Sequence, residues 1–329
     1  MPRAKITEVA REAGVSLSTV SRVMNGNQSV DAALAERVRE VAARLGYTAN
    51  PLARSLVLGR TQTISVVIPD LANPTFQAIL RGLSHAAAKD GYHVLISDTE
   101  ERVEHESEVA TTTRQRTDGV ILCAPRLPQD ELAALLPTIA PAVVINRGPQ
   151  ENAPTVAADY GTAIMALIDH LRGLGHRRLA FVSGAVSSAS GEARRRALAA
   201  ACDADPGLEV IEIPGGVDFD SGAAVASAVI DSAATAVLAF NDLVAMGLLS
   251  AVSARGIRVP EQLSIVGFDG IPFAAYTSPP LTTAAVPAAD LGRNAWAAMH
   301  ALLSGADPVA TETFIPELVV RESTGPAPR

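Results

Sequence analysis

The sequence predicts two parts, an all-α head and an α/β body made of two similar lobes. Residues 1–47 contain three helical patterns and no strand-like run. From Thr63 onward, short apolar runs alternate with helical patterns, and this series occurs twice. Charge divides the chain in the same way, because residues 1–60 carry +4 and the other 269 residues carry −12, a total of −8. A small basic head on an acidic body indicates contact with nucleic acid through the head alone.

Length and composition are those of a globular protein. The 329 residues are 48% hydrophobic and 19% charged, which is enough apolar material for two or three cores. Two cysteines, Cys123 and Cys202, make no disulfide framework and favour a reducing compartment. The N-terminus lacks the apolar segment of a signal peptide, and no apolar run reaches the ~18 residues of a membrane span. We therefore expect a cytoplasmic protein.

The head is predicted to hold three helices, at about Thr7 to Ala13, Ser16 to Met24 and Asp31 to Leu45. Thr7, Ser16 and Asp31 are residue types that cap helix N-termini, and Gly46 follows the last turn as a C-cap. Only a short turn, Gly14-Val15, separates the first two helices. That spacing is the geometry of helix-turn-helix DNA readers.

The second helix is predicted to have two different faces. At about 100° per residue, one arc of about 140° holds Leu17, Ser18, Ser21 and Arg22. Thr19, Val20 and Val23 fall on the opposite side, where the valines can pack on the other helices. The polar arc suits a major groove, because arginine can bond guanine, serine several base edges, and leucine a thymine methyl. The alternative is a three-helix bundle whose polar face is only solvated.

The run KITEVAREAGVSLSTVSRVMNG, followed by GYTANPLARSL, resembles the DNA-binding head of the lac-repressor/galactose-repressor (LacI/GalR) family of bacterial transcription regulators. The resemblance extends over the whole chain. It implies that the positions of Leu17, Ser18 and Arg22 read base edges. Phosphate contacts are implied for Thr7, Ser16, Thr19, Ser21 and Asn25. Leu17 stands where relatives often carry a larger polar or aromatic residue, which leaves the operator sequence open.

The segment NPLARSLVLGR, residues 50–60, connects the head to the body. Asn50 and Pro51 form a helix start and Gly59 an end, but so short a helix is marginal alone. The resemblance implies a hinge helix that forms when two copies pack together on DNA. It places Leu56 as a wedge in the minor groove, with Ala53 allowing close approach and Arg54 near a phosphate. The alternative is a flexible linker with incidental leucines.

The body is predicted to contain two parallel sheets. Its strand-like runs are TISVVIPD, YHVLISDT, DGVILCAP and PAVVINR, then RRLAFVSG, LEVIEIPG, TAVLAF and LSIVGFD. Helices are expected at about 74–90, 101–115, 160–174, 191–203, 221–232 and 242–255. Buried strands that alternate with helices predict parallel sheets covered on both faces. Ligands of such folds bind at the carboxyl ends of the strands, here in the cleft between lobes.

The body also resembles a periplasmic sugar-binding protein, as LacI/GalR cores do. The matching blocks are DGVI (118–121), GHRRLAFVSG (175–184), FNDLVAMG (240–247), LSIVGFDG (263–270) and SPPLTT (278–283). This resemblance implies a periplasmic-binding-protein-like body of two Rossmann-like lobes. The expected domains are a helix-turn-helix head at 1–48, a hinge at 49–60, a first lobe at 61–158 with about 285–317, and a second lobe at 159–284 with about 318–329.

Candidate effector-binding residues lie at strand ends. The resemblance implies that Arg194 and Asp269 hold a polar ligand, and a guanidinium beside a carboxylate can bond vicinal hydroxyls. The other candidates are Asn241 in the second lobe and Asn73, Phe76, Asn146 and Arg147 in the first. Structural alternatives exist for several of them. Asp269 can cap a turn, Asn73 can start a helix, and Arg194 lies in a run of three arginines that can be solvated.

Two further positions bear on the ligand. Phe219 lies near, but not at, the place where relatives cover the ligand with an aromatic ring. Ala288 stands where some sugar-binding relatives have such a ring, which argues against simple sugar stacking.

Enzyme motifs are missing from the sequence. It has no G-x-G-x-x-G after the first strand, no P-loop and no G-x-S-x-G, and its six histidines lack metal-ligand spacing. We expect no catalysis, cofactor or metal, with an α/β enzyme or a solute-binding protein as the alternatives. The predicted partners are a double-stranded DNA operator, a second copy in a homodimer, and a small effector, but no membrane. A sugar or sugar derivative is favoured as effector, with a nucleobase or nucleoside as the alternative.

Overall fold

The computed structural model describes residues 4–24, 30–47, 59–306 and 312–328. It divides into two compact units, Met1–Gln62 and Thr63–Arg329, each described here by itself. The predicted contacts of Asn25, Asn50, Ala53, Arg54 and Leu56 lie outside the described residues. In the part that is described, no helix combines the length and apolar character needed to cross a membrane.

The first unit is a three-helix head with α1 (Ile6–Ala13), α2 (Leu17–Met24) and α3 (Ala32–Leu45). Its small core closes around Val9, Val20 and Val38, all fully buried. The predicted cap of α3 is confirmed, because Asp31 Oδ1 accepts the N–H groups of Ala33 and Leu34 at 3.1 Å. The predicted cap of α1 is wrong. Thr7 lies inside that helix, which begins one residue earlier because Glu8 accepts the backbone N–H of Lys5 at 3.0 Å.

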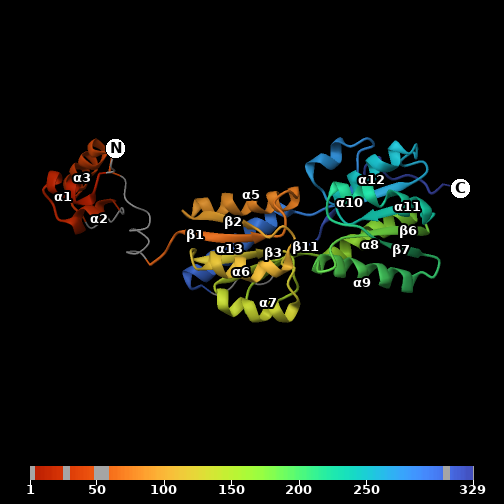
Figure 1. Ribbon diagram of the computed structural model, residues 1–329, viewed down its shortest axis with the longest axis horizontal. Helices are drawn as coiled ribbons and strands as arrows, with labels where there is room; N and C mark the ends of the chain where they lie inside the picture. Colours follow the sequence, from red (N-terminus) through yellow and green to blue (C-terminus); the bar gives the residue numbers. More distant parts are fainter. Residues whose placement is uncertain (1–3, 25–29, 48–58, 307–311, 329) are drawn as a thin grey trace. The chain divides into compact units, whose positions relative to one another are not determined.

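The second unit contains two six-stranded sheets. The first has the order β11-β5-β4-β3-β1-β2, and all of its neighbouring strands are parallel. Its strands are β1 (Thr63–Ile68), β2 (His93–Asp98), β3 (Gly119–Cys123), β4 (Ala142–Ile145), β5 (Thr155–Ala158) and β11 (Glu312–Phe314). Helices α5 (Pro74–Lys89) and α13 (Ala288–Ser304) cover one face, and α6 (Val103–Arg114) and α7 (Gln129–Leu135) cover the other (Figure 1).

The second sheet has the order β12-β10-β9-β8-β6-β7, with β10 and β12 antiparallel. Its strands are β6 (Arg178–Ser183), β7 (Glu209–Pro214), β8 (Ala236–Ala239), β9 (Ser264–Asp269), β10 (Thr282–Ala285) and β12 (Glu317–Val319). Helices α8 (Tyr160–Gly173) and α9 (Ala189–Ala204) cover one face. Helices α10 (Phe219–Ala224), α11 (Ala226–Asp231) and α12 (Asp242–Ala254) cover the other (Figure 1). Short 3₁₀ turns lie at Leu136–Ile139 and Pro272–Tyr276.

The chain passes between the two sheets three times. It leaves the first sheet at β5, returns from β10 through α13, and goes back from β11 to β12. The return helix α13 packs tightly along α5, where Gly82 faces the backbone of Ala289 and Gly292 faces that of Ile79. Three crossings allow the two sheets to change their angle while their cores stay intact.

Several elements differ from the sequence prediction. Strands β5, β10, β11 and β12 were not expected, and each has only three or four residues, too few for a clear pattern. The helix expected at 221–232 is split into α10 and α11. Strand β2, expected to be buried, is an edge strand whose Leu95 and Ile96 are 39% and 43% exposed.

Candidate functional site

The exposed face of α2 is the candidate DNA-reading surface. Leu17 is 48% exposed, and Ser18 and Arg22 are also exposed. On the opposite face Val20 and Val23 are buried in the head core, as predicted. The guanidinium of Arg22 lies along the helix, with Nη2 3.5 Å from Ser18 Oγ and Nε 3.4 Å from Ser18 O. The residues implied to read bases therefore share one accessible face.

The residues implied to contact phosphates are gathered only in part. Ser16 Oγ accepts the N–H of Thr19 at 3.1 Å and lies 2.9 Å from its hydroxyl and 2.8 Å from Ser18 Oγ. These hydroxyls form one cluster at the start of α2. Ser21 is half-buried on the same helix, and Thr7 is exposed on α1.

A second polar site lies between the two sheets, at the carboxyl ends of their strands. Its inner chamber has a volume of about 40 Å³. The first sheet and its loops supply Asn73, Thr75, Phe76, Glu101, Ala124, Arg126 and Asn146, and the second sheet with its helices and loops supplies Tyr160, Ser190, Arg194, Val217, Phe240, Asn241 and Asp269. Of the seven predicted effector residues, the chamber brings together all except Arg147. Strand ends meet here because β6 to β10 and all strands of the first sheet are parallel, and the two sheets face each other with these edges.

Arg194 is the most buried cation of this chamber. It is 2% exposed, whereas the side chains of its neighbours Arg195 and Arg196 are 30% and 72% exposed. Its guanidinium carbon lies 4.1, 4.6 and 4.8 Å from the ring centres of Phe268, Phe240 and Tyr160, within cation–π distance. Burial lowers its pKa, and its Nε has no hydrogen-bond partner. This arginine of the run of three is therefore directed inward and is not solvated.

Asp269 faces the chamber from the end of β9. Thr75 Oγ1, from the opposite lobe, donates to its Oδ2 at 2.8 Å, so one hydrogen bond spans the cleft. Burial raises the pKa of Asp269 to about 6, although nearby Arg194 acts in the opposite direction. Among the described residues no carboxylate lies within 4.0 Å of an Arg194 nitrogen. The two groups thus line one chamber without a direct ion pair.

The three asparagines hold the loops that shape the chamber. Asn73 Oδ1 accepts the N–H of Thr75 at 2.9 Å, and Asn146 Oδ1 accepts that of Ala158 at 3.1 Å. Both polar ends of Asn241 are used, because Oδ1 accepts the N–H of Val244 and Nδ2 donates to Val217 O, each at 2.8 Å. In this structure the three asparagine side chains fix the backbone around the site.

Unusual backbone conformations also occur at this edge of the sheets. Four residues that line the chamber have a positive φ: Glu101, Ala124, Asn146 and Asp269. Such conformations cost free energy in residues other than glycine and concentrate at functional sites. Within the described residues, no group of three or more His, Cys, Asp or Glu side chains could hold a metal ion.

Sequence reasoning missed several chamber residues. Arg126 is 6% exposed and makes a two-point ion pair with Glu101, with both N–O distances 2.7 Å. Tyr160 and Phe240 form two walls around Arg194. Arg126 directly follows the strand-like run DGVILCAP and Phe240 ends the run TAVLAF, so the rule that selected Asn146 could have selected them too.

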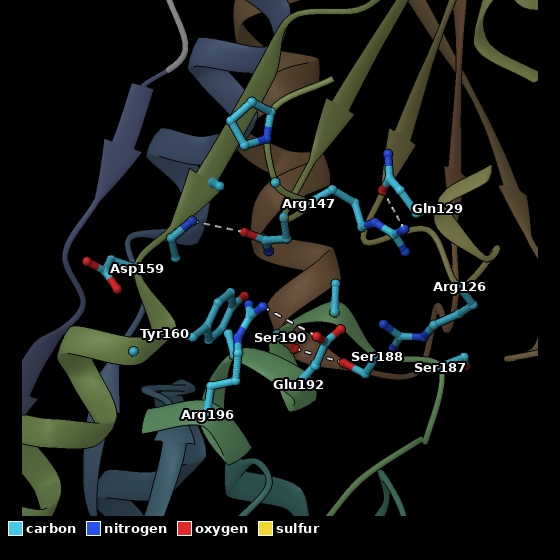
Figure 2. A pocket seen from close by; sticks show the side chains of 18 of the residues that line it. Arg126, Gln129, Arg147, Asp159, Tyr160, Ser187, Ser188, Ser190, Glu192 and Arg196 are labelled. Atoms are coloured by element: carbon cyan, nitrogen blue, oxygen red, sulfur yellow. Dashed lines mark hydrogen bonds and ion pairs between the residues drawn. The ribbon is translucent and has the colours of Figure 1, made fainter. Parts of the chain in front are cut away.

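An outer cavity of about 920 Å³ adjoins the inner chamber and shares Arg126, Asn146, Tyr160 and Ser190 with it (Figure 2). Arg147 lines this outer cavity. Its guanidinium donates to Pro125 O at 3.1 Å, Leu127 O at 3.0 Å and Gln129 Oε1 at 3.0 Å. Neither Phe219, which is 45% exposed at the start of α10, nor Ala288, at the start of α13, lines either space.

Known protein families match both the head and the body of the chain. Residues 5–50 match the model of bacterial regulatory proteins of the lacI family, and residues 168–324 match a periplasmic binding protein-like domain. The chain is 31% identical to the HTH-type transcriptional repressor CytR of Escherichia coli (strain K12), over 99% of this chain and 97% of that protein.

Two solved structures are similar over nearly the whole chain. The lac repressor dimer bound to operator and the anti-inducer ONPF has a TM-score of 0.89 at 25% identity, over 98% of this chain and 100% of that one. The transcriptional regulator CelR in complex with cellobiose has a TM-score of 0.69 at 29% identity, with the same coverage.

A helix-turn-helix head joined to a two-lobed binding core defines a ligand-responsive DNA-binding regulator. The chain belongs to the LacI family of bacterial transcription regulators, whose members are regulators and not enzymes.

Proposed function

We propose that this protein is a repressor that binds a near-palindromic operator as a homodimer and responds to a small polar effector in the cleft. The observation that carries the proposal is the exposed face of α2, where Leu17, Ser18 and Arg22 lie together. A single such helix makes few base contacts, whereas two heads related by a two-fold axis read two half-sites with added energy. A cytoplasmic location follows from this role.

The edge of the first sheet supports the dimer. Strand β2 exposes Leu95 and Ile96, and Leu71 in the preceding β1–α5 loop is 43% exposed. An uncovered edge strand with apolar side chains favours association with another chain. A second copy that covers this edge would remove these groups from water.

Effector binding would act through the angle between the lobes. Arg194 and Asp269 lie on the second lobe, while Thr75 and Phe76 lie on the first, so a ligand that bonds both sides favours one closure angle. In a dimer that angle sets the spacing of the two heads. Operator and effector are then coupled reciprocally through one two-state element. A sugar-like ligand is favoured because paired guanidinium and carboxylate groups suit vicinal hydroxyls.

The test of DNA binding is a titration with a palindromic operator at several salt concentrations. Binding should weaken steeply with salt, because each phosphate contact releases counterions. Sedimentation of the free protein at micromolar concentration should show a dimer. A flat salt response together with a monomer would contradict the dimeric repressor.

The test of the effector site is Arg194→Ala. We expect loss of the effector response with operator affinity nearly unchanged, because the head forms a compact unit separate from Arg194. Arg195→Ala, on the same helix but outside both spaces, is the matched control and should keep the response. Loss of operator binding in the Arg194 variant would instead show that this residue is structural.

A further inference from the structure

The outer cavity is lined by a buried cation that makes no direct ion pair. Arg147 is 9% exposed, and its three hydrogen-bond acceptors, two carbonyls and the amide of Gln129, are neutral. Among the described residues no carboxylate lies within 4.0 Å of its nitrogens. Burying an unpaired charge costs free energy, and burial lowers the pKa of Arg147 accordingly. A ligand that brings a negative charge would remove this cost.

The carboxylates around the two spaces are already engaged. Asp159 caps α8 by accepting the N–H and hydroxyl of Thr162 at 2.9 and 2.7 Å. Glu192 pairs with Arg196 at 3.3 Å, and Glu101 pairs with Arg126. Glu106, whose charge also acts on Arg147, accepts the N–H groups of Arg126 and Leu127 at 2.8 and 3.1 Å. None of these carboxylates forms a direct ion pair with Arg147.

The opposite wall of the outer cavity is the first turn of α9. Ser187, Ser188 and Ser190 line the cavity there, across from Arg126 and Arg147 (Figure 2). The positive end of this 16-residue helix lies at the cavity, although the N–H of Gly191 is already bonded to Ser188 Oγ at 3.2 Å. Ser190 also connects the two spaces, because its Oγ lies 2.9 Å from Ser188 Oγ and 3.4 Å from Nη1 of Arg194. In the inner chamber, the Nε of the 2% exposed Arg194 has no hydrogen-bond partner, so it can donate to a polar ligand.

We propose that the effector is a polyhydroxylated molecule with an acidic group at one end, either a phosphate ester or a carboxylate. Its hydroxyl-bearing part extends from the outer cavity toward Arg194 and Asp269, because the inner chamber of about 40 Å³ admits only part of such a molecule. Its acidic group lies in the outer cavity between Arg147, Arg126 and the start of α9. The reverse orientation is disfavoured, because it would place the acid beside the carboxylate of Asp269. This inference rests on the proposed effector function of the cleft.

Inorganic phosphate is the first probe, applied to the full-length protein without DNA. Phosphate should raise the melting temperature above that in chloride of equal ionic strength. Arg147→Gln should weaken phosphate binding about tenfold, since it removes a charge-assisted bond. Glu192→Gln should strengthen it, because a negative charge leaves the cavity while the exposed helix surface is kept. Arg195→Gln, which alters an ion pair with Glu212 outside the cavity, is the control and should behave as wild type.

The phosphate titrations of the wild type and the variants can overturn the proposal in several ways. An equal phosphate response in the wild type and in Arg147→Gln places the anion elsewhere and overturns the proposal. No response of the wild type to phosphate overturns the phosphate-ester form, and the comparison with glucuronate below then decides the carboxylate form. Should Arg147→Gln fail to fold, Glu192→Gln alone decides, because unchanged or weaker phosphate binding in that variant contradicts the inference.

Matched ligand pairs then identify the acidic group. Ribose is compared with ribose 5-phosphate, and glucose with glucose 6-phosphate and glucuronate, by melting temperature and by operator release. A response to the phosphate esters or to the uronate, but not to the neutral parents, supports the proposal and distinguishes its two forms. A neutral sugar that acts as strongly as its acidic partner overturns the inference while it confirms the proposed effector function. Failure of the proposed function itself would show as absent operator binding.

Discussion

Three consecutive arginines on α9 have three different environments. Arg194 is enclosed by Phe268, Phe240 and Tyr160, Arg195 pairs with Glu212, and Arg196 pairs with Glu192 beside the outer cavity. Successive residues of a helix point about 100° apart, so neighbours in sequence face different surroundings. The run itself does not show which member is buried, and the aromatic residues that decide it come from three other segments of the chain.

His176 makes the stability of the body sensitive to pH. It is fully buried, with Nδ1 2.8 Å from Thr235 Oγ1 and Nε2 3.0 Å from the carbonyl of Gly325. Desolvation lowers its pKa below the ordinary value of 6.5. Above pH 6.5 neither the folded nor the unfolded state binds a proton here. Below pH 6.5 the unfolded state binds a proton before the folded state does. The free energy of unfolding should therefore fall as pH falls.

Melting temperatures measured from pH 7.5 to 5.0 check this expectation. The wild type should lose stability through this window more steeply than His176→Gln. His105→Gln, on the exposed surface of α6, should keep the wild-type slope. Equal slopes in the wild type and in His176→Gln would assign the pH dependence to other groups.

At the level of helices and strands, two pairs of helices pack closely through glycines. Helices α5 and α13 cross where glycines replace side chains, and so do α10 and α12, through Gly222 and Gly247. In each pair a Cβ would overlap the backbone of the partner helix. The pairing of α13 with α5 matters most for function, because α5 carries Phe76 and Thr75 at its start. A well-packed return helix thus positions one wall of the inner chamber.

Gly82→Ala should therefore lower the stability of the body by about 1–3 kcal/mol, the usual cost of overpacking. Gly173→Ala is a matched control at the end of α8, where an added Cβ meets nothing within 4 Å. The control should be neutral or slightly stabilising, since alanine restricts the unfolded chain. Thermal unfolding of both variants measures this difference, and equal melting temperatures would show that the helix crossing can relax.

At the scale of the molecule, function requires that the head and the body influence each other. The chain forms two compact units, and the segment 48–58 between them lies outside the described residues. Our sequence-based hypothesis assigns residues 50–60 to a hinge helix that orders on DNA. Coupled folding of this kind would let the body control DNA affinity without any direct contact between the effector and DNA.

Leu56→Ala tests the hinge. If Leu56 enters the minor groove and kinks the duplex, its truncation should weaken specific operator binding more than nonspecific binding. The measurement is a pair of titrations, one with a palindromic operator and one with scrambled DNA of equal length. Leu58→Ala in the same segment is the control. Equal losses on both DNAs would favour a simple linker.

The sequence by itself determined the family, the helix-turn-helix head, eight of the strands and six of the fourteen residues that line the inner chamber. These features depend on local patterns, namely helix caps, apolar periodicity, and polar residues that follow buried strands. Only the tertiary structure decided that Arg126 pairs with Glu101, that three rings enclose Arg194, and that Arg147 lies in a separate outer cavity. Those contacts join residues far apart in the chain, and their partners are set by how the two sheets face each other.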